Sequence, residues 1–339
     1  MKKSITVAGV TAGPGQKAYG AVAIPDLLAD GQILEIPFIV FNGSKDGPWL
    51  YMQVAQHASE VHALEGIRRV LANLDPKTLS GAITFCLPNP LGFSFPACWE
   101  VMTPQMNRVG LGDPNGILTE RIVDAWWVNF VKGKADYVID FHTGRRGNPV
   151  WVFYEGRGVR AEVSAEVVDK AERMARVFGA ELLYKEMEPY LGGNTFRGAC
   201  VKNGIPTIVP ELDGHSIFVE SVVQIAARGL KNIMVDLGMI KGKIELPPKQ
   251  YLLKWVADER VPAVRNNKGG VFIPLVKMGD IVKKGDKVGI IYSPRTLQEI
   301  ETLTAHKNGY VFSIAENPVK NAGDSVMEIE EILEVFENR

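Results

Sequence analysis

The chain has 339 residues, of which 46% are hydrophobic and 23% are charged, and its formal net charge is −1. These values are typical of a globular protein with one large or two ordinary domains, and they exclude a global field that would attract nucleic acid or anionic lipid. No apolar run reaches the length of a membrane span, and three widely spaced cysteines suggest no disulfide framework. We therefore expect a cytoplasmic protein that binds neither nucleic acid nor membrane.

Up to about residue 240, short apolar runs alternate with segments of helical periodicity. This alternation is the pattern of an α/β sheet with helices on its faces. Helical spacing is expected to weaken or kink near Gly229 in the last and longest of these segments. The predicted strands cover residues 48–55, 81–88, 136–141, 149–154 and 206–211, and the predicted helices cover 60–74, 118–131 and 216–239.

One stretch does not fit this alternation. The 28 residues from Asn89 to Gly116 are rich in Pro and Gly. Structureless loops of that length are unusual in compact domains and are often functional.

The composition changes after residues 245–250. The sequence beyond contains two similar halves, 269–288 and 308–326, each with a Gly-led strand, a turn, and a Gly-Asp pair followed by Val. Two such copies predict a small all-β domain built from interlocked halves. We therefore expect an α/β domain over residues 1–245 and a β-rich domain over 246–339.

Polar side chains stand at the carboxyl ends of three predicted strands. His57 and Glu60 follow the first strand, His142 follows the third, and Glu211 ends the last. Because sites in open α/β sheets form at the carboxyl ends of strands, we expect these side chains to meet at one edge. Two His and one carboxylate are the ligand set of a catalytic zinc with one position left for water. A further carboxylate suits a general base.

Each of these residues also has a simpler interpretation. A single His at a strand end is usually a hydrogen-bonded structural residue. Glu60 suits the first turn of a helix, where it complements the helix dipole, and Glu211 suits a surface position. Only five His occur in the chain, however, and two of them stand at strand ends beside acids. The joint pattern favours a metal site, although the spacing alone leaves both interpretations open.

Four short motifs occur in the order seen in one enzyme family: QHASE at a strand end, MNR in the long loop, DFHTG and PELDG. With these motifs the chain resembles the succinylglutamate desuccinylase/aspartoacylase family of zinc carboxypeptidase-like hydrolases over nearly its whole length. The resemblance implies a zinc carboxypeptidase-like mixed sheet flanked by helices and one Zn²⁺ per chain. It implies that His57, Glu60 and His142 are the zinc ligands and that Glu211 is the general base that activates the zinc-bound water.

The resemblance also points to residues that bind the substrate. Asn107 and Arg108 match the Asn-Arg pair that holds the substrate carboxylate, which agrees with the bidentate geometry of a guanidinium. The alternative for Arg108 is an exposed loop cation. Asn194, Thr195 and Arg197, upstream of the last predicted strand, are candidates for lining the acyl pocket.

Two departures from the family pattern matter. Ala58 stands where the motif usually has Gly, which is a mild change unless its φ is positive. Relatives generally carry an Arg that polarises the scissile carbonyl shortly before the Asn-Arg pair, but no Arg or Lys occurs between Asn89 and Asn107. We hypothesise that Arg145 or Arg146, in the motif HTGRRG, takes over this role or contacts another substrate group. The alternative is a solvated cationic turn.

The C-terminal part resembles biotinyl/lipoyl-like barrel-sandwich domains, whose cofactor lysine sits in a hairpin tip between the two halves. The equivalent stretch here, residues 290–305, contains no lysine. A swinging-arm carrier is therefore disfavoured. We expect this domain to pack against the catalytic domain and to narrow the access to its site.

Together these observations predict a zinc-dependent hydrolase that cleaves the amide bond of a small N-acyl amino acid, with Glu211 as general base. The substrate is a small molecule with a carboxylate, and its acyl group and amino acid stay open. The alternatives are a carboxypeptidase-type exopeptidase and a catalytically lapsed ligand-binding homologue. A homo-oligomer is compatible with the aromatic pair Trp126–Trp127, which we expect to be exposed.

Overall fold

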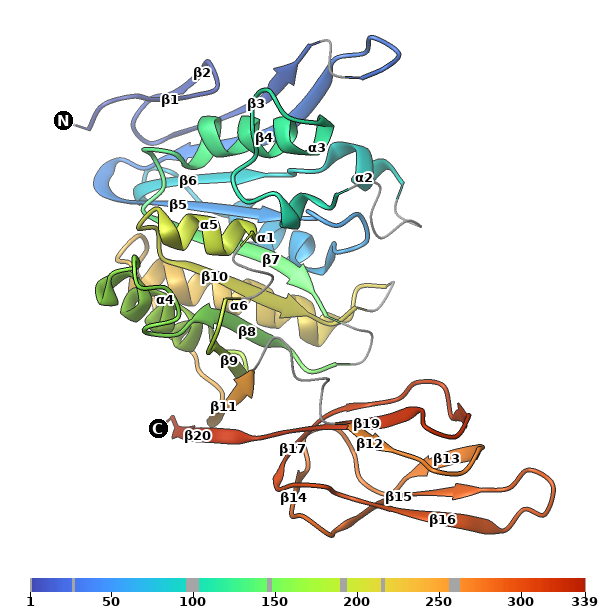
Figure 1. Ribbon diagram of the computed structural model, residues 1–339. Helices are drawn as coiled ribbons and strands as arrows, with labels where there is room; N and C mark the ends of the chain where they lie inside the picture. Colours follow the sequence, from blue (N-terminus) through green and yellow to red (C-terminus); the bar gives the residue numbers. More distant parts are fainter. Residues whose placement is uncertain are drawn as a thin grey trace.

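The computed structural model describes residues 2–25, 28–95, 104–144, 148–189, 194–214, 217–255 and 263–338. Its central feature is a ten-stranded mixed sheet (Figure 1). In spatial order the strands are β20 (Ile332–Glu337), β11 (Lys249–Trp255), β9 (Leu182–Glu186), β8 (Trp151–Glu155), β10 (Thr207–Leu212), β7 (Tyr137–Thr143), β5 (Lys45–Val54), β6 (Ser80–Cys86), β4 (Leu34–Asn42) and β3 (Gln16–Ile24).

The four central strands of this sheet run in the same direction. β5 is parallel to β6 and β7, and β7 is parallel to β10. Their carboxyl ends therefore share one edge. β8 runs antiparallel to β10, so that the ends of β8 and β9 lie toward the opposite edge.

Helices cover both faces of the sheet. Alternate residues of β7 show this division, because Ile139 and Phe141 belong to one hydrophobic core and Val138 belongs to the other. Strands buried on both faces read as continuous apolar runs, as the sequence does here. The first face carries α1 (His62–Leu71), α4 (Ala165–Phe178) and α6 (Glu220–Asp236), and the second carries α3 (Leu118–Trp126), the π-helix η2 (Trp127–Val131) and α5 (Phe196–Lys202).

The remaining described elements are short. β1 (Ile5–Val7) and β2 (Val10–Ala12) form a separate antiparallel pair. The long Pro- and Gly-rich stretch contains α2 (Pro90–Ser94) and a 3-10 turn, η1 (Met106–Arg108).

α6 runs unbroken through Gly229, where a Cβ atom would meet the ring of Phe178 at 2.5 Å. Gly229, where the sequence predicted a weakened or kinked helix, is therefore a position at which α6 packs closely against Phe178 of α4.

The prediction that Trp126 and Trp127 are exposed is wrong. Trp126 is completely buried and Trp127 is 6% exposed. The Trp126 ring stacks on Phe196, with the ring centroids 4.9 Å apart, and belongs to the core that α3, α5 and β4 share. A surface contact through this pair is thereby excluded.

Residues 263–330 form a C-terminal β region of two four-stranded antiparallel sheets around their own core. The Gly-Asp turns appear as expected, with φ of +93° at Gly279 and +90° at Gly323, values that favour glycine. The first sheet contains β12 (Ala263–Arg265), β19 (Ser325–Glu330), β17 (Gly309–Ile314) and β14 (Ile281–Val282), and the second contains β16 (Glu299–Thr304), β15 (Lys287–Tyr292), β13 (Gly270–Pro274) and β18 (Val319–Lys320).

Strands on either side of this region join the large sheet. β11 pairs with β9, and β20 returns to pair with β11 (Figure 1). An aromatic cluster also links the two parts, with Phe312 of β17 against Trp151 of β8 and Tyr184 of β9. The C-terminal β region therefore lies against the β8–β9 side of the sheet.

Candidate functional site

The three predicted metal ligands lie together at the carboxyl edge of the central strands. His57 and Glu60 occupy the turn between β5 and α1, and His142 lies near the end of β7. Glu60 Oε1 is 3.0 Å from His57 Nδ1, and Glu60 Oε2 is 2.9 Å from His142 Nδ1. All three side chains are buried, and one ligand atom from each lies within 4.8 Å of the others.

The backbone turns sharply where β5 ends. Ala55 has a φ of +63°, which is costly for a residue with a Cβ atom. Asn89 supports the same turn, because its Nδ2 donates to the carbonyl of Gln56 at 2.8 Å while its Oδ1 accepts from Gly92 N. Ala58 is absent from the positive-φ residues, so replacing the family's usual Gly there causes no backbone strain. The strained residue, Ala55, thus lies three residues before Ala58, where the sequence departs from the family motif.

The contacts within this group shift the pKa values of Glu60 and His142. Burial alone would raise the pKa of Glu60, but His142 and His57 outweigh it and lower the pKa to about 2. Burial would lower the pKa of His142, but the carboxylates of Asp140 and Glu60 raise it well above its usual value. The cluster therefore holds an ionised carboxylate between two imidazoles.

A buried network behind His142 was not predicted. His142 Nε2 lies 3.1 Å from Asp140 Oδ2, and Gln53 Nε2 donates to Asp140 Oδ1 at 2.7 Å. Tyr51 O–H donates to Gln53 Oε1 at 2.7 Å and lies 3.0 Å from Cys86 Sγ. Such contacts fix the tautomer and orientation of a metal-binding imidazole.

The sequence did contain a signal for this network. Asp140 and His142 are two apart on one strand and so share a face, and Gln53 is the register partner of Asp140 on β5. Both polar residues interrupt apolar runs. A buried polar side chain needs a partner, which is reason enough to connect the two.

Glu211 lies beside the cluster. It is the register partner of His142 on β10, and the residue is half-buried. Burial raises its pKa to about 8; His142 opposes this rise, while Glu60 and Asp140 add to it. A carboxyl with this pKa can exchange a proton near neutral pH.

The other register partner of Glu211 is aromatic. Trp151 of β8 lies opposite Glu211 and is buried. Its ring covers Gly144, two residues after His142, where a Cβ atom would lie 2.0 Å from the ring. Because Phe312 packs on the same ring at 5.1 Å between centroids, the C-terminal β region reaches this edge of the sheet.

Asn107 and Arg108 lie on η1, which is bound to the start of α5. Phe196 N donates to Asn107 Oδ1 at 2.9 Å, and Gly110 N donates to the carbonyl of Asn194 at 2.9 Å. Because Asn107 Oδ1 already accepts this hydrogen bond, the two hydrogens on Asn107 Nδ2 are the donors that can bind another group. Arg108 Nη1 donates to the Asn107 carbonyl at 2.7 Å.

The remaining candidates have different surroundings. Thr195 is buried and caps α5 by accepting from Gly198 N at 3.1 Å. Arg197 is buried, and its Nη1 lies 2.6 Å from Glu186 Oε2. Arg145 and Arg146 lie outside the described residues.

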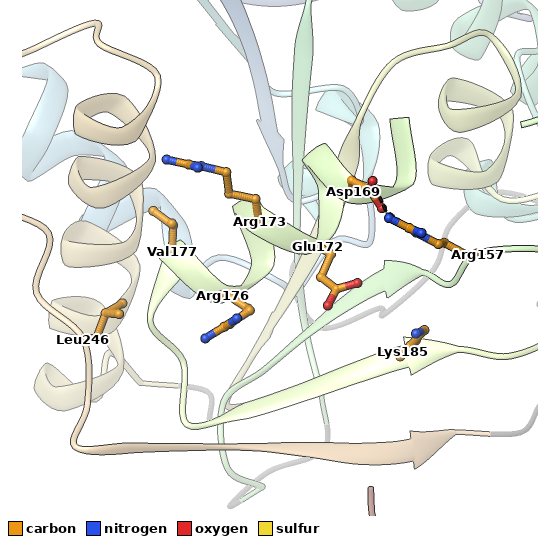
Figure 2. A pocket seen from close by; sticks show the side chains of 8 residues that line it. All are labelled: Arg157, Asp169, Glu172, Arg173, Arg176, Val177, Lys185 and Leu246. Atoms are coloured by element: carbon orange, nitrogen blue, oxygen red, sulfur yellow. Dashed lines mark hydrogen bonds and ion pairs between the residues drawn. The ribbon is translucent and has the colours of Figure 1, made fainter. Parts of the chain in front are cut away.

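A cavity of about 620 Å³ lies elsewhere, beside α4, and shares no residue with this cluster (Figure 2). Three of its four lining cations are already engaged. Arg157 binds Asp169 through two contacts of 2.6 Å, Arg173 binds Asp236, and Arg176 lies over the ring of Phe336. The cavity therefore presents no converging set of side chains comparable with the buried ligands.

The family model described as the succinylglutamate desuccinylase/aspartoacylase catalytic domain matches residues 46–237, more than half of the chain. The chain belongs to this family. All of the candidate site residues fall inside the matched range. Within the part of the chain that the structure describes, no helix is long and apolar enough to cross a membrane.

Members and relatives of the desuccinylase/aspartoacylase family match over almost the whole chain. The N-alpha-acetyl-L-2,4-diaminobutyric acid deacetylase of Halomonas elongata is 24% identical over 333 residues, which cover 94% of this chain and 89% of that protein. A family structure from Rhodobacter sphaeroides has a TM-score of 0.74 at 20% identity and covers 94% of this chain and 96% of its own. The product-bound ectoine utilization protein EutE from Ruegeria pomeroyi has a TM-score of 0.75 at 20% identity, with 93% and 95% covered. These structures share the mixed α/β core and the C-terminal all-β region.

Proposed function

We propose that this protein is a zinc-dependent deacylase that hydrolyses the amide bond of a small N-acyl amino acid. The observation that carries the proposal is the buried His57, Glu60 and His142 cluster, with Glu211 beside it on the next strand. Membership of the family and the similarity to a deacetylase support the same reaction class. In this proposal the protein is cytoplasmic and its substrate is a small molecule with a carboxylate.

The three buried side chains fit a zinc ion. Two imidazole nitrogens and one carboxylate are a catalytic zinc donor set, and both Nδ1 atoms face the Glu60 carboxylate. His142 Nε2 lies 3.1 Å from Asp140 Oδ2. We propose that this carboxylate holds the proton on Nε2 and so directs the lone pair of Nδ1 toward the ligand position. Zinc bound there supplies Lewis acidity to the scissile carbonyl and to a water molecule. We propose one Zn²⁺ per chain.

Glu211 is the proposed general base. Its carboxylate takes the proton of the attacking water and later donates it to the leaving amine nitrogen. The pKa of about 8 describes the protein without metal. A cation bound nearby favours the carboxylate form and lowers this pKa.

Asn107 and Arg108 are proposed to hold the substrate carboxylate, with Arg108 as a fork of donors and Asn107 Nδ2 as a directional one. Asn194 and Thr195 stand at the start of α5 beside this pair, and we propose that they border the acyl group. Arg145 or Arg146 remains our proposal for polarising the carbonyl. Replacing each by Ala should lower kcat/KM, and a loss below about threefold in both would remove this role.

Two alternatives use the same site. A carboxypeptidase-type exopeptidase would cleave longer substrates, and a lapsed homologue would bind a ligand without turnover. A panel of N-acetyl, N-succinyl and N-formyl amino acids, with Nα-acetyl-2,4-diaminobutyric acid and dipeptides included, separates them. We expect turnover of an N-acyl amino acid; cleavage of dipeptides alone, or metal and ligand binding without turnover, contradicts the proposal.

We further propose that residues 246–339 form a barrel-sandwich-like unit that narrows access to the site, next to a catalytic unit of residues 1–245. Truncation near residue 245 would also remove β11 and β20 from the large sheet, so a point variant is the sharper test. Phe312→Ala removes the ring that packs on Trp151.

Phe312→Ala should shift selectivity toward bulkier acyl groups by about threefold or more, because Trp151 gains room to move. The measurement is the ratio of kcat/KM for a long and a short acyl group. Val319→Ala, at an exposed position of the same region, is the matched control. An unchanged ratio in a folded Phe312→Ala protein would remove the proposed role of this region.

Asp140→Asn should weaken zinc binding by about 10- to 100-fold. The amide is neutral and can present an N–H group to His142 Nε2, which disturbs both the charge and the tautomer. Competition with a chromogenic chelator measures the affinity, and Asp136→Asn, outside the network on the same strand's amino side, controls for loss of charge. Equal affinities for Asp140→Asn and the wild type would exclude this supporting role.

A further inference from the structure

Four ionisable side chains that the proposed reaction does not use are buried together. Glu155 is the last residue of β8 and Glu186 is the last residue of β9, and the two are register partners. Arg160 and Arg197 approach them from a loop and from α5. Each of the four side chains belongs to a residue that is at most 5% exposed.

The charges within this group balance. Arg197 Nη1 lies 2.6 Å from Glu186 Oε2 and 3.9 Å from Glu155 Oε2, and Arg160 Nη1 contacts Glu155 Oε2. Taking four charges out of water is costly, and apolar side chains of similar volume are often as stable or more so. Stability alone is therefore a weak reason for the group.

The position of Arg197 suggests what the group does. Phe196, its immediate neighbour, donates its backbone N–H to Asn107 Oδ1, and the Asn194 carbonyl accepts from Gly110 N. The start of α5 is thus bonded to Asn107 of η1 and to Gly110, two residues after η1. Arg197, the next residue of α5, is bound to Glu186 at the end of β9.

We propose that Arg197 is a positioning residue that holds the start of α5, and through it Asn107 and Arg108, in the geometry that receives the substrate carboxylate. The inference rests on the proposed function for the identity of that carboxylate. It gives Arg197 an indirect role, because its guanidinium is bound to Glu186 and approaches Glu155.

Two variants separate positioning from stability. Arg197→Met leaves the Glu186 charge buried without this partner and should lower the Tm by about 5 to 10 °C. Arg197→Met combined with Glu186→Gln removes both charges and should recover most of the Tm. Both proteins should show a KM for the N-acyl amino acid raised about fivefold or more, with kcat changed less than about threefold, because substrate binding is what is lost.

Arg197→Lys keeps the charge, and its KM should lie between that of Arg197→Met and that of the wild type. The matched control is Arg173→Met with Asp236→Asn, which removes an ion pair on the other face of the sheet and should leave KM unchanged. A double variant with both wild-type Tm and wild-type KM overturns the proposal.

Hydrogen exchange keeps this test separate from the proposed reaction. The amides of Phe196 and Gly110 should exchange about tenfold faster in the double variant than in the wild type, because the contacts between α5 and η1 loosen. If no N-acyl amino acid is turned over by the wild type, the proposed function fails while exchange still decides on positioning. Unchanged exchange at both amides would show that Arg197 does not hold this contact.

Discussion

Replacing Glu211 by Gln is expected to lower kcat/KM for the N-acyl amino acid by about 10²- to 10⁴-fold. The amide has nearly the same shape as the carboxylate but cannot accept a proton from water. His57, Glu60 and His142 keep their contacts with one another, so the variant should retain its zinc. Steady-state kinetics together with metal analysis of the purified protein measure both quantities.

The dependence of the melting temperature on pH shows whether the Glu211→Gln protein is folded. The pKa of Glu211 is raised from 4.5 to about 8, so the folded metal-free protein keeps a proton that the unfolded chain releases between these values. Stability of the metal-free wild type therefore falls as the pH rises through this window. Because Gln has no charge to bury, metal-free Glu211→Gln should melt higher than the wild type at pH 9, with a smaller difference at pH 5.

Glu220→Gln is the matched control, because this carboxylate is exposed on α6 and pairs with Arg69. It should leave kcat/KM unchanged. A Glu211→Gln enzyme that keeps more than about a tenth of the wild-type kcat/KM would contradict the assignment of Glu211 as general base.

Glu60→Gln is expected to weaken zinc binding by more than about 100-fold, beyond the effect of losing an outer partner such as Asp140. The carboxylate contacts both imidazoles, at 3.0 Å and 2.9 Å, and it is ionised because its pKa is about 2. The amide removes this charge and turns an N–H group toward one Nδ1 atom. Activity should fall with the zinc content, and chelator competition measures the affinity.

Glu65→Gln, on the same stretch of chain, is the control for this variant. Its carboxylate binds Arg68 and Arg69 and does not belong to the ligand cluster. Zinc affinity should be unchanged. Wild-type zinc affinity in Glu60→Gln would mean that the ion binds elsewhere.

The position of the ligand cluster could be predicted because polar residues end apolar runs. Buried parallel strands have a simple signature, and their carboxyl ends meet at one edge whatever the strand order. His57, Glu60, His142 and Glu211 could therefore be placed together before any distance was known. The supporting contacts of Asp140 and Gln53 depend on strand register, which no single segment encodes.

The buried tryptophans show why exposure was harder to predict. Trp126 and Trp127 lie on a helix whose partners include Phe38 of β4, and strands over residues 16–42 were not among those predicted. Without those strands the aromatic face had no visible partner. The pairing of β11 with β20 in the large sheet was also not predicted. The whole C-terminal β region separates these two strands in the sequence, so neither strand shows its partner.

The buried ion pairs combine both difficulties. Glu186 and Arg197 are eleven positions apart, and they meet only because β9 ends beneath the start of α5. From the sequence, Arg197 was a candidate for lining the acyl pocket, and no prediction was made for Glu186. The contact between the Arg197 guanidinium and Glu186 depends on strand register and on the reversal of the chain between β9 and α5, which a single segment of sequence does not show.

Zinc content measured alongside turnover tests the central claim most directly. The purified wild type should contain about one zinc per chain and hydrolyse an N-acyl amino acid, in keeping with a site of three protein ligands. Chelation should abolish the hydrolysis, and one equivalent of zinc should restore it. Full hydrolysis by protein that has been stripped of metal would contradict the account.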